Sequence, residues 1–328
     1  MLTGTLELSQ NSSNSRTVHK SKPKRIEIVA QDNIYSVAFL VDGKHFVSGG
    51  QEGKIRRWRT EDGKEVGTPM DAGNAVYNLA VSRDGKWIVS GTGSGELAVW
   101  DVQSQKKVTE WKGHDQWVRG VDISPDGTRI ATGSCSDKTV CVWSLSTGEQ
   151  LLGPLEHDRM VVAVKFSPDG RLIAAATLQR SIRVYDSQNG CLLVDTPIKV
   201  FNFFNQSLVW VNSKNLLSAD GNLNCLDVST GTTRSSWPIH DGGGCIALAS
   251  NGTFIAASSG SSGGSAVSFW DTTTHKQIGP IINHTYVVAS MAISANYDLV
   301  ISGGYVITLW NIRNVLPSSY YEDVSALA

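Results

Sequence analysis

The sequence of 328 residues lacks a long apolar run, a surplus of charge of either sign and a secretory signal. A membrane-spanning helix needs about 20 mainly apolar residues, and no stretch approaches that length. The formal net charge of -1 argues against a general affinity for nucleic acid or anionic membranes. Residues 1–21 are polar, without the apolar core of a signal peptide. We therefore expect a protein of the cytoplasm or nucleus that binds neither membranes nor nucleic acid.

Motifs for metals, phosphates and disulfides are also missing. The five cysteines are scattered and form no C-x-x-C pair, so we expect most of them to be reduced and buried as small hydrophobic side chains. No P-loop, H-E-x-x-H motif or EF-hand loop occurs. We expect no metal, no cofactor and no small-molecule substrate.

What the sequence does contain is an internal repeat. Seven marks recur, each an aromatic residue followed by a polar one, with the fifth degenerate. The marks are Trp58-Arg59, Trp100-Asp101, Trp143-Ser144, Tyr185-Asp186, Leu226-Asp227, Trp270-Asp271 and Trp310-Asn311. Successive marks lie 40 to 44 residues apart. A fixed period of this length is typical of architectures in which each repeat is one supersecondary unit.

Each repeat also carries turn and strand signals in the same phase. In most repeats an Asp-Gly or Asn-Gly pair precedes the mark, as at Asp126-Gly127 and Asn251-Gly252, and such pairs readily form tight hairpins. Short alternating apolar runs flank the turns, as at 121–123 and 139–143. Alternation with period two and no helical stripe predicts an all-β, antiparallel structure.

The third repeat closely resembles a WD repeat. It contains Gly113-His114, Ser124-Pro125-Asp126-Gly127, Ser136-Asp137 and Trp143 in the family's order. The other repeats match in part, and the fifth, at about 201–238, is weak. The resemblance implies a seven-bladed β-propeller of four-stranded antiparallel blades.

In WD-repeat proteins a His, a Ser or Thr, an Asp and the Trp form a hydrogen-bonded chain that locks the blade. By similarity, the blade lock of the third repeat consists of His114, Thr132, Asp137 and Trp143. The first two repeats depart from this set, with Ala30 and Glu52 in one and Ala72 and Ser94 in the other. We therefore expect blade three to be among the stiffest.

The two ends of the repeat region are expected to meet. Little chain follows Trp310, whereas the alternating segment 25–29 precedes the first repeat. This segment can supply the outermost strand of the last blade, which closes the ring and removes open sheet edges. We therefore expect a flexible polar and basic leader at 1–23, the propeller at 24–315 and a C-terminal tail at 316–328. The basic leader is interpreted as a solvated segment, with a nuclear-import signal or phosphate-binding arm as alternatives.

Members of this family generally bind partners on the narrow top face of the ring. Alignment to blade three places large or polar side chains there, at the starts of inner strands and just before the Asp positions. The candidates are Asn33, Tyr35, Gln51, Tyr77, Trp117, Arg119, Ser136, Met160 and Leu178. Trp, Tyr and Arg dominate binding energy at many interfaces, so we expect a partner off centre, over blades one to four. Packing inside the channel is the alternative for the inner-strand aromatics.

The function expected from these features is that of a non-catalytic interaction scaffold or recognition module for a protein or peptide. Residues 260–264 satisfy the nucleophile-elbow pattern G-x-S-x-G, but they fall in a Gly/Ser-rich loop between two strands, whereas an elbow requires a strand–turn–helix. Phrases such as residues 166–177 are similar to repeats of fungal proteins that join a NACHT-type ATPase to a WD-repeat sensor. The alternatives are a subunit of a ubiquitin-ligase, chromatin or RNA-processing complex and, less favoured, a propeller hydrolase, because a fold alone does not identify a function.

Overall fold

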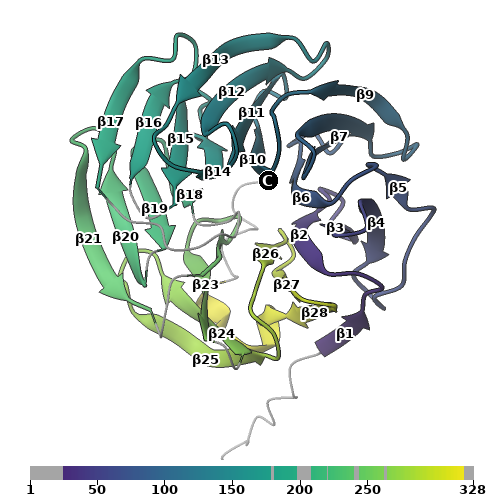
Figure 1. The fold of residues 1–328 in the computed structure, drawn as a ribbon. Helices are drawn as coiled ribbons and strands as arrows, with labels where there is room; N and C mark the ends of the chain where they lie inside the picture. Colours follow the sequence, from purple (N-terminus) through teal and green to yellow (C-terminus); the bar gives the residue numbers. More distant parts are fainter. Residues whose placement is uncertain are drawn as a thin grey trace, which may run out of the picture.

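The computed structural model describes residues 25–178, 181–197, 208–219, 221–239, 244–261 and 264–320. Within these ranges the chain forms seven four-stranded antiparallel sheets that stand radially around a central axis (Figure 1). The helical segments in the same ranges are two short 3-10 turns, η1 (Ile312–Asn314) and η2 (Ser318–Tyr320). The fold is therefore the all-β, seven-bladed propeller that the repeat predicts.

In the first six blades, four strands consecutive in the chain run from the axis outward. Blade one contains β2 (Ile34–Phe39), β3 (His45–Gly50), β4 (Lys54–Arg59) and β5 (Met70–Asp71). Blade two contains β6 (Val76–Val81), β7 (Trp87–Thr92), β8 (Glu96–Asp101) and β9 (Lys107–Lys112). Blade three contains β10 (Val118–Ile123), β11 (Arg129–Ser134), β12 (Thr139–Ser144) and β13 (Gln150–Glu156).

Blade four contains β14 (Val161–Phe166), β15 (Leu172–Thr177), β16 (Ile182–Asp186) and β17 (Leu192–Thr196). Blade five contains β18 (Leu208–Trp210), β19 (Asn215–Ala219), β20 (Asn222–Asp227) and β21 (Thr232–Pro238). Blade six contains β22 (Ile246–Leu248), β23 (Phe254–Ser261), β24 (Gly264–Asp271) and β25 (Gln277–His284).

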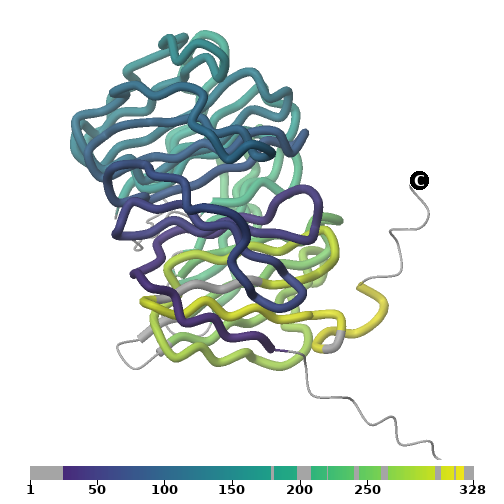
Figure 2. The backbone as a smooth tube through the Cα atoms, turned by 90° about the vertical axis from the view of Figure 1, so that its right-hand side faces the viewer, coloured from purple at the N-terminus to yellow at the C-terminus, as the bar shows by residue number. Residues whose placement is uncertain are grey.

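Blade seven combines strands from both ends of the described chain. Its order is β1-β28-β27-β26, formed by β26 (Ser290–Ile293), β27 (Asp298–Gly303), β28 (Val306–Asn311) and β1 (Arg25–Val29). In β1, Arg25 lies opposite Trp310 and Val29 lies opposite Val306. Figure 2 shows the purple strand β1 beside the yellow strands of this blade. The segment ahead of the first repeat thus supplies the last blade's outer strand, as expected.

The hairpins between first and second strands explain the recurring Asp-Gly and Asn-Gly pairs. Five blades have such a pair, and the φ angles of its glycine lie between 62° and 73° at Gly43, Gly85, Gly127, Gly170 and Gly252. This left-handed conformation costs glycine little because it has no Cβ. In blade seven the corresponding hairpin has Tyr297 at φ 60° in place of glycine. That ring is fully buried beside Phe254, so packing holds a backbone conformation that the residue type disfavours.

The hydrophobic core lies between neighbouring blades. One cluster joins Val89 and Val99 of blade two to Ile130 and Trp143 of blade three. Another joins Ile307 of blade seven to blade one, so the junction between the chain ends is packed like the others. Each sheet buries its faces only against its neighbours, which is why a single repeat is not expected to be stable alone.

The first residues of the expected tail contact blade six. Leu316 is buried in a core cluster. The Tyr320 hydroxyl donates a hydrogen bond to Asp271 Oδ2 at 2.8 Å, and its ring meets the Phe254 ring edge-on. The leader at 1–23 and residues 321–328 lie outside the described residues.

Candidate functional site

The structure joins the four candidate blade-lock residues of blade three in one hydrogen-bonded chain. His114 Nδ1 lies 2.9 Å from Asp137 Oδ2, and His114 Nε2 lies 2.7 Å from Thr132 Oγ1. Trp143 Nε1 donates to the same Thr132 oxygen at 2.8 Å. Burial raises the pKa of Asp137, but hydrogen bonding to His114 and the charge of that ring outweigh this effect and lower it to about 2. The imidazole is fully buried, which assigns it to structure.

The other blades keep the backbone of this arrangement while changing its side chains. The blade-start N–H binds the preceding hairpin carbonyl in each case: His114 to Gly95 at 3.1 Å and Ala72 to Gly53 at 2.9 Å. Ala72 therefore stands where an imidazole would enter blade two. There, Trp100 Nε1 still donates to Ser90 Oγ at 2.9 Å.

Blade four connects its blade-start histidine to the aromatic residue of its mark without an intervening hydroxyl. The position of Thr132 is taken by Ala175, which has no hydroxyl and lies opposite Arg183 in the sheet. Tyr185 replaces the tryptophan, and its hydroxyl reaches His157 Nε2 directly at 3.1 Å. Burial lowers the pKa of His157 to about 4, so the ring is neutral at physiological pH.

We use the term top face for the side formed by the blade-start loops and by the hairpins between second and third strands. In blade one, Asn33 Nδ2 donates to Gln51 Oε1 at 3.0 Å. This hydrogen bond links the blade-start loop to the hairpin between the second and third strands. In blade three, Ser136 is exposed in the hairpin beside Asp137. These three polar candidates are therefore at or near the surface.

Three of the large candidates form a continuous stack, which we call the aromatic row: Tyr35, Tyr77 and Arg119. The two tyrosine rings lie 5.0 Å apart and are nearly parallel, with 10° between their planes. The guanidinium carbon of Arg119 lies 4.4 Å from the centre of the Tyr77 ring, within range of a cation–π interaction. The residues come from β2, β6 and β10, the innermost strands of three successive blades. All three are half-buried, so they both pack together and reach solvent.

Trp117 precedes β10 and is 43% exposed, although its side chain is large and apolar. Its φ of 37° is a conformation that a bulky residue seldom adopts. Two backbone bonds hold it: Trp117 N–H donates to the Gly93 carbonyl at 3.0 Å, and Cys135 N–H donates to the Trp117 carbonyl at 3.1 Å. The fold thus maintains an unfavourable backbone conformation at an exposed indole, a combination that points to function.

The two remaining candidates belong partly to the core. Met160 and Leu178 are half-buried and pack against the cluster between blades four and five. The Leu178 N–H donates to the Met160 carbonyl at 2.9 Å. The structure therefore brings the aromatic row together in blades one to three and leaves these two residues apart from it.

Sequence reasoning missed a buried carboxylate beside the aromatic row. Asp32 is 6% exposed, and its Oδ2 accepts the Glu52 N–H at 2.7 Å. Burial raises the pKa of Asp32. The equivalent positions in blades two and three carry Asn74 and Gln116, so the repeat pattern contains no signal for an acid here.

Cysteines and clustered histidines and acids are among the groups that a catalytic or metal site would use. Among them, no group of three or more His, Cys, Asp or Glu residues is placed to hold a metal ion. Burial raises the pKa of both Cys135 and Cys141 to about 11, which keeps these thiols protonated and poorly nucleophilic. The G-x-S-x-G pattern lies where β23 and β24 pair, with Ser262 outside the described residues. No helix in the same part of the chain is long and apolar enough to cross a membrane.

Comparison with known families agrees with this geometry. The family model "WD domain, G-beta repeat" matches residues 24–59, 63–101, 105–144 and 149–186. The four matched segments contain the third strand of blades one to four, and each ends at the last residue of that strand. No match was found among curated proteins. WD-repeat propellers typically serve as non-enzymatic scaffolds that bind proteins. The chain is a seven-bladed β-propeller whose first four blades match WD repeats.

Proposed function

We propose that this propeller is a non-catalytic interaction module that binds a protein or peptide on its top face, over blades one to four. The observation that carries the proposal is the aromatic row together with the exposed indole of Trp117. Tyr35, Tyr77 and Arg119 stack across three blades, and Trp117 is presented at the surface in a strained conformation.

The arrangement is suited to binding because it is fixed before a partner arrives. Side chains of these types often contribute about 2 kcal/mol or more each when an interface buries them. Here the rings already restrain one another, so a partner would lose less conformational entropy in ordering them. Lateral rigidity comes from the closed ring, in which every blade packs against two neighbours.

The test uses a partner identified by affinity purification and mass spectrometry with the full chain. We expect the double variant Trp117→Ala/Arg119→Ala to weaken its affinity by about 30-fold or more, the equivalent of about 2 kcal/mol. The matched control is Val108→Ala/Leu151→Ala, which removes two apolar side chains of similar exposure, 55% and 53%, from outer strands. Unchanged affinity in the Trp117/Arg119 variant would eliminate the proposal.

The identity of the partner would distinguish a sensor from a subunit of a ubiquitin-ligase, chromatin or RNA-processing complex. A sensor role is supported by the likeness of the repeat phrases to those of NACHT-type fungal proteins, and sequencing the full-length transcript would test whether an ATPase accompanies the propeller. Recovery with ubiquitin-ligase, chromatin or RNA-processing subunits would favour the second form. Reproducible turnover of a hydrolysable substrate would instead favour the propeller hydrolase. We propose a cytoplasmic or nuclear location, to be tested by imaging the tagged chain.

The domain limits also remain a proposal. We infer a leader at 1–23, the propeller at 24–315 and a tail at 316–328. Limited proteolysis followed by mass spectrometry tests these limits. Early cleavage is expected before residue 24, whereas the start of the tail, up to Tyr320, should resist cleavage because Tyr320 contacts blade six.

A further inference from the structure

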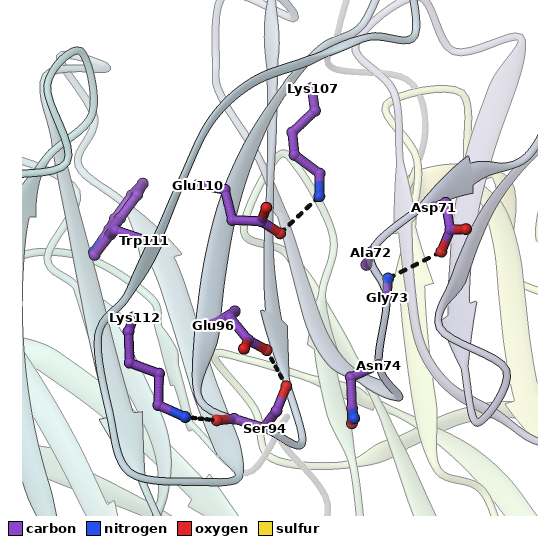
Figure 3. A pocket seen from close by; sticks show the side chains of 10 residues that line it. All are labelled: Asp71, Ala72, Gly73, Asn74, Ser94, Glu96, Lys107, Glu110, Trp111 and Lys112. Atoms are coloured by element: carbon purple, nitrogen blue, oxygen red, sulfur yellow. Dashed lines mark hydrogen bonds and ion pairs between the residues drawn. The ribbon is translucent and has the colours of Figure 1, made fainter.

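A cleft of about 610 Å³ opens between blades one and two. Its walls are the blade-start loop Asp71–Asn74, the hairpin residues Ser94 and Glu96, and the outer strand β9 (Figure 3). The volume falls within the range of about 300 to 1,000 Å³ that is usual for ligand sites. The cleft is polar and charged, in contrast to the apolar packing between blades.

Two features of the sequence leave this space open. The outer strand β5 of blade one has two residues, against six in β9, so it covers little of the flank of blade two. The blade-start residue is Ala72, where blade three has the imidazole of His114. A short strand and a missing ring therefore coincide at one inter-blade position.

Blades one and four show what fills the corresponding region elsewhere. In blade four, Arg183 on the third strand lies opposite Asp195 on the outer strand, and its Nε donates to Asp195 Oδ2 at 3.0 Å. In blade one, Arg56 occupies the same place two residues before the mark. Its guanidinium binds Glu65 at 3.0 Å and the Gln31 side chain at 3.0 Å, and its side chain is only 11% exposed.

Blade two keeps the acid of this pair but lacks the arginine. Glu110 on β9 lies opposite Ala98 on β8, the register that Asp195 and Arg183 occupy in blade four. Glu110 Oε1 accepts a hydrogen bond from Lys107 of its own strand at 2.6 Å. An ionised carboxylate has about four acceptor positions, so this contact leaves capacity for a second donor.

Ion pairs and hydrogen bonds position the acids that line the cleft. The lining contains the carboxylates of Asp71, Glu96 and Glu110 and the ammonium groups of Lys107 and Lys112, and Lys54 pairs with Asp71 at 2.6 Å. The hydrogen bond from Ser94 lowers the pKa of Glu96 despite the opposing effect of burial, so this carboxylate is ionised at neutral pH. Figure 3 shows Glu96 and Glu110 reaching toward the space between β9 and the Asp71 loop.

We propose that this cleft binds the guanidinium group of an arginine side chain from a protein partner, in the place that Arg56 and Arg183 fill within their own blades. The planar guanidinium carries five N–H donors and can bridge two carboxylates, which an ammonium does less well. The residues that line the cleft include no member of the aromatic row.

The test measures binding of N-acetyl-arginine amide to the full chain by isothermal titration calorimetry. We expect saturable binding, with affinity at least about 10-fold lower for the neutral citrulline analogue and for Glu110→Gln, because each removes a charged hydrogen bond. Ala98→Arg places the arginine of blades one and four inside the cleft and is expected to abolish binding. Glu149→Gln, an exposed acid on another blade, is the matched control and should bind as the native chain does.

Several results would overturn the proposal. These are the absence of saturable binding, equal affinity for the arginine and citrulline compounds, or native affinity in Glu110→Gln. If Ala98→Arg does not fold, the Glu110→Gln and citrulline comparisons still decide. Trp117→Ala/Arg119→Ala is expected to bind the arginine compound normally. Loss of binding in that variant would place the compound on the aromatic row or Trp117 and refute the cleft as its site.

Discussion

Replacing Thr132 by valine tests how the blade lock stabilises blade three. The side chain is fully buried, and valine has nearly the same shape, so the change removes a hydroxyl without opening a large cavity. The Asp137 carboxylate can only accept, so His114 Nδ1 donates to it. Thr132 Oγ1 lies 2.7 Å from His114 Nε2 and also accepts the Trp143 N–H.

The magnitude follows from the two groups that lose this partner. A buried polar group without a hydrogen bond costs about 1–3 kcal/mol. Thr132→Val strands both Trp143 Nε1 and His114 Nε2, so we expect a loss of about 2–6 kcal/mol in the free energy of unfolding. Ser90→Ala in blade two is the matched control. It strands only Trp100 Nε1, because Ala72 stands in place of the histidine, and should cost about 1–3 kcal/mol.

Urea unfolding followed by tryptophan fluorescence gives both values, and hydrogen exchange of β11 and β12 shows whether the loss is local. The expected order is a larger loss in Thr132→Val, with faster exchange confined to blade three and its neighbours. A loss in Thr132→Val that is no greater than in Ser90→Ala would refute the shared role of the hydroxyl.

Three further substitutions test other parts of the structure. The folded pKa of Asp137, about 2, lies below its ordinary value of 3.8, so its stabilising effect is present above pH 3.8 and is lost as the pH falls through 2. Asp137→Asn should be less stable than the native chain at pH 7 by about 1–2 kcal/mol after allowance for solvent screening. Unfolding measured at lower pH should show this difference in stability becoming smaller. His157 has a pKa of about 4 in the folded protein against an ordinary value of 6.5, so stability should decline by about 2–3 kcal/mol between pH 7 and 4.5. His157→Phe should remove this pH-dependent decline. A variant whose stability depends on pH as the native chain's does would contradict the role of His157. In Gly50→Ala, the new Cβ would lie 2.2 Å from the Asn33 carbonyl oxygen, so thermal unfolding should begin earlier and partner affinity should fall with the displaced top-face loop; a native melting curve would contradict this.

The blade number, the closing strand and the lock of blade three could all be predicted because they depend on residues that recur in phase. Gly127 and Trp143 occupy positions whose backbone and hydrogen-bonding requirements are the same in most repeats. Once the phase is known, β1 follows from the count of strands, since the last repeat lacks an outer one. These features are properties of the repeat, and the repeat is visible in the sequence.

The remaining features depend on how departures from the repeat are accommodated. Tyr185 compensates for Ala175 by reaching His157 directly, whereas Ala72 is not compensated by any ring and adjoins the cleft. A pattern that shows only which residue is missing does not distinguish these outcomes. Likewise, the alignment places Tyr35 and Tyr77 on neighbouring strands, but their parallel stacking is set by side-chain torsions.

A fixed top face requires blades one and seven to be joined, and β1 closes the ring at this junction. Hydrogen exchange with mass spectrometry on the full chain measures this junction. We predict that the amides of β1 that pair with β28 are protected to the same degree as those of β28 itself. Complete exchange of residues 25–29 within seconds, while Val306–Asn311 stays protected, would contradict a closed ring.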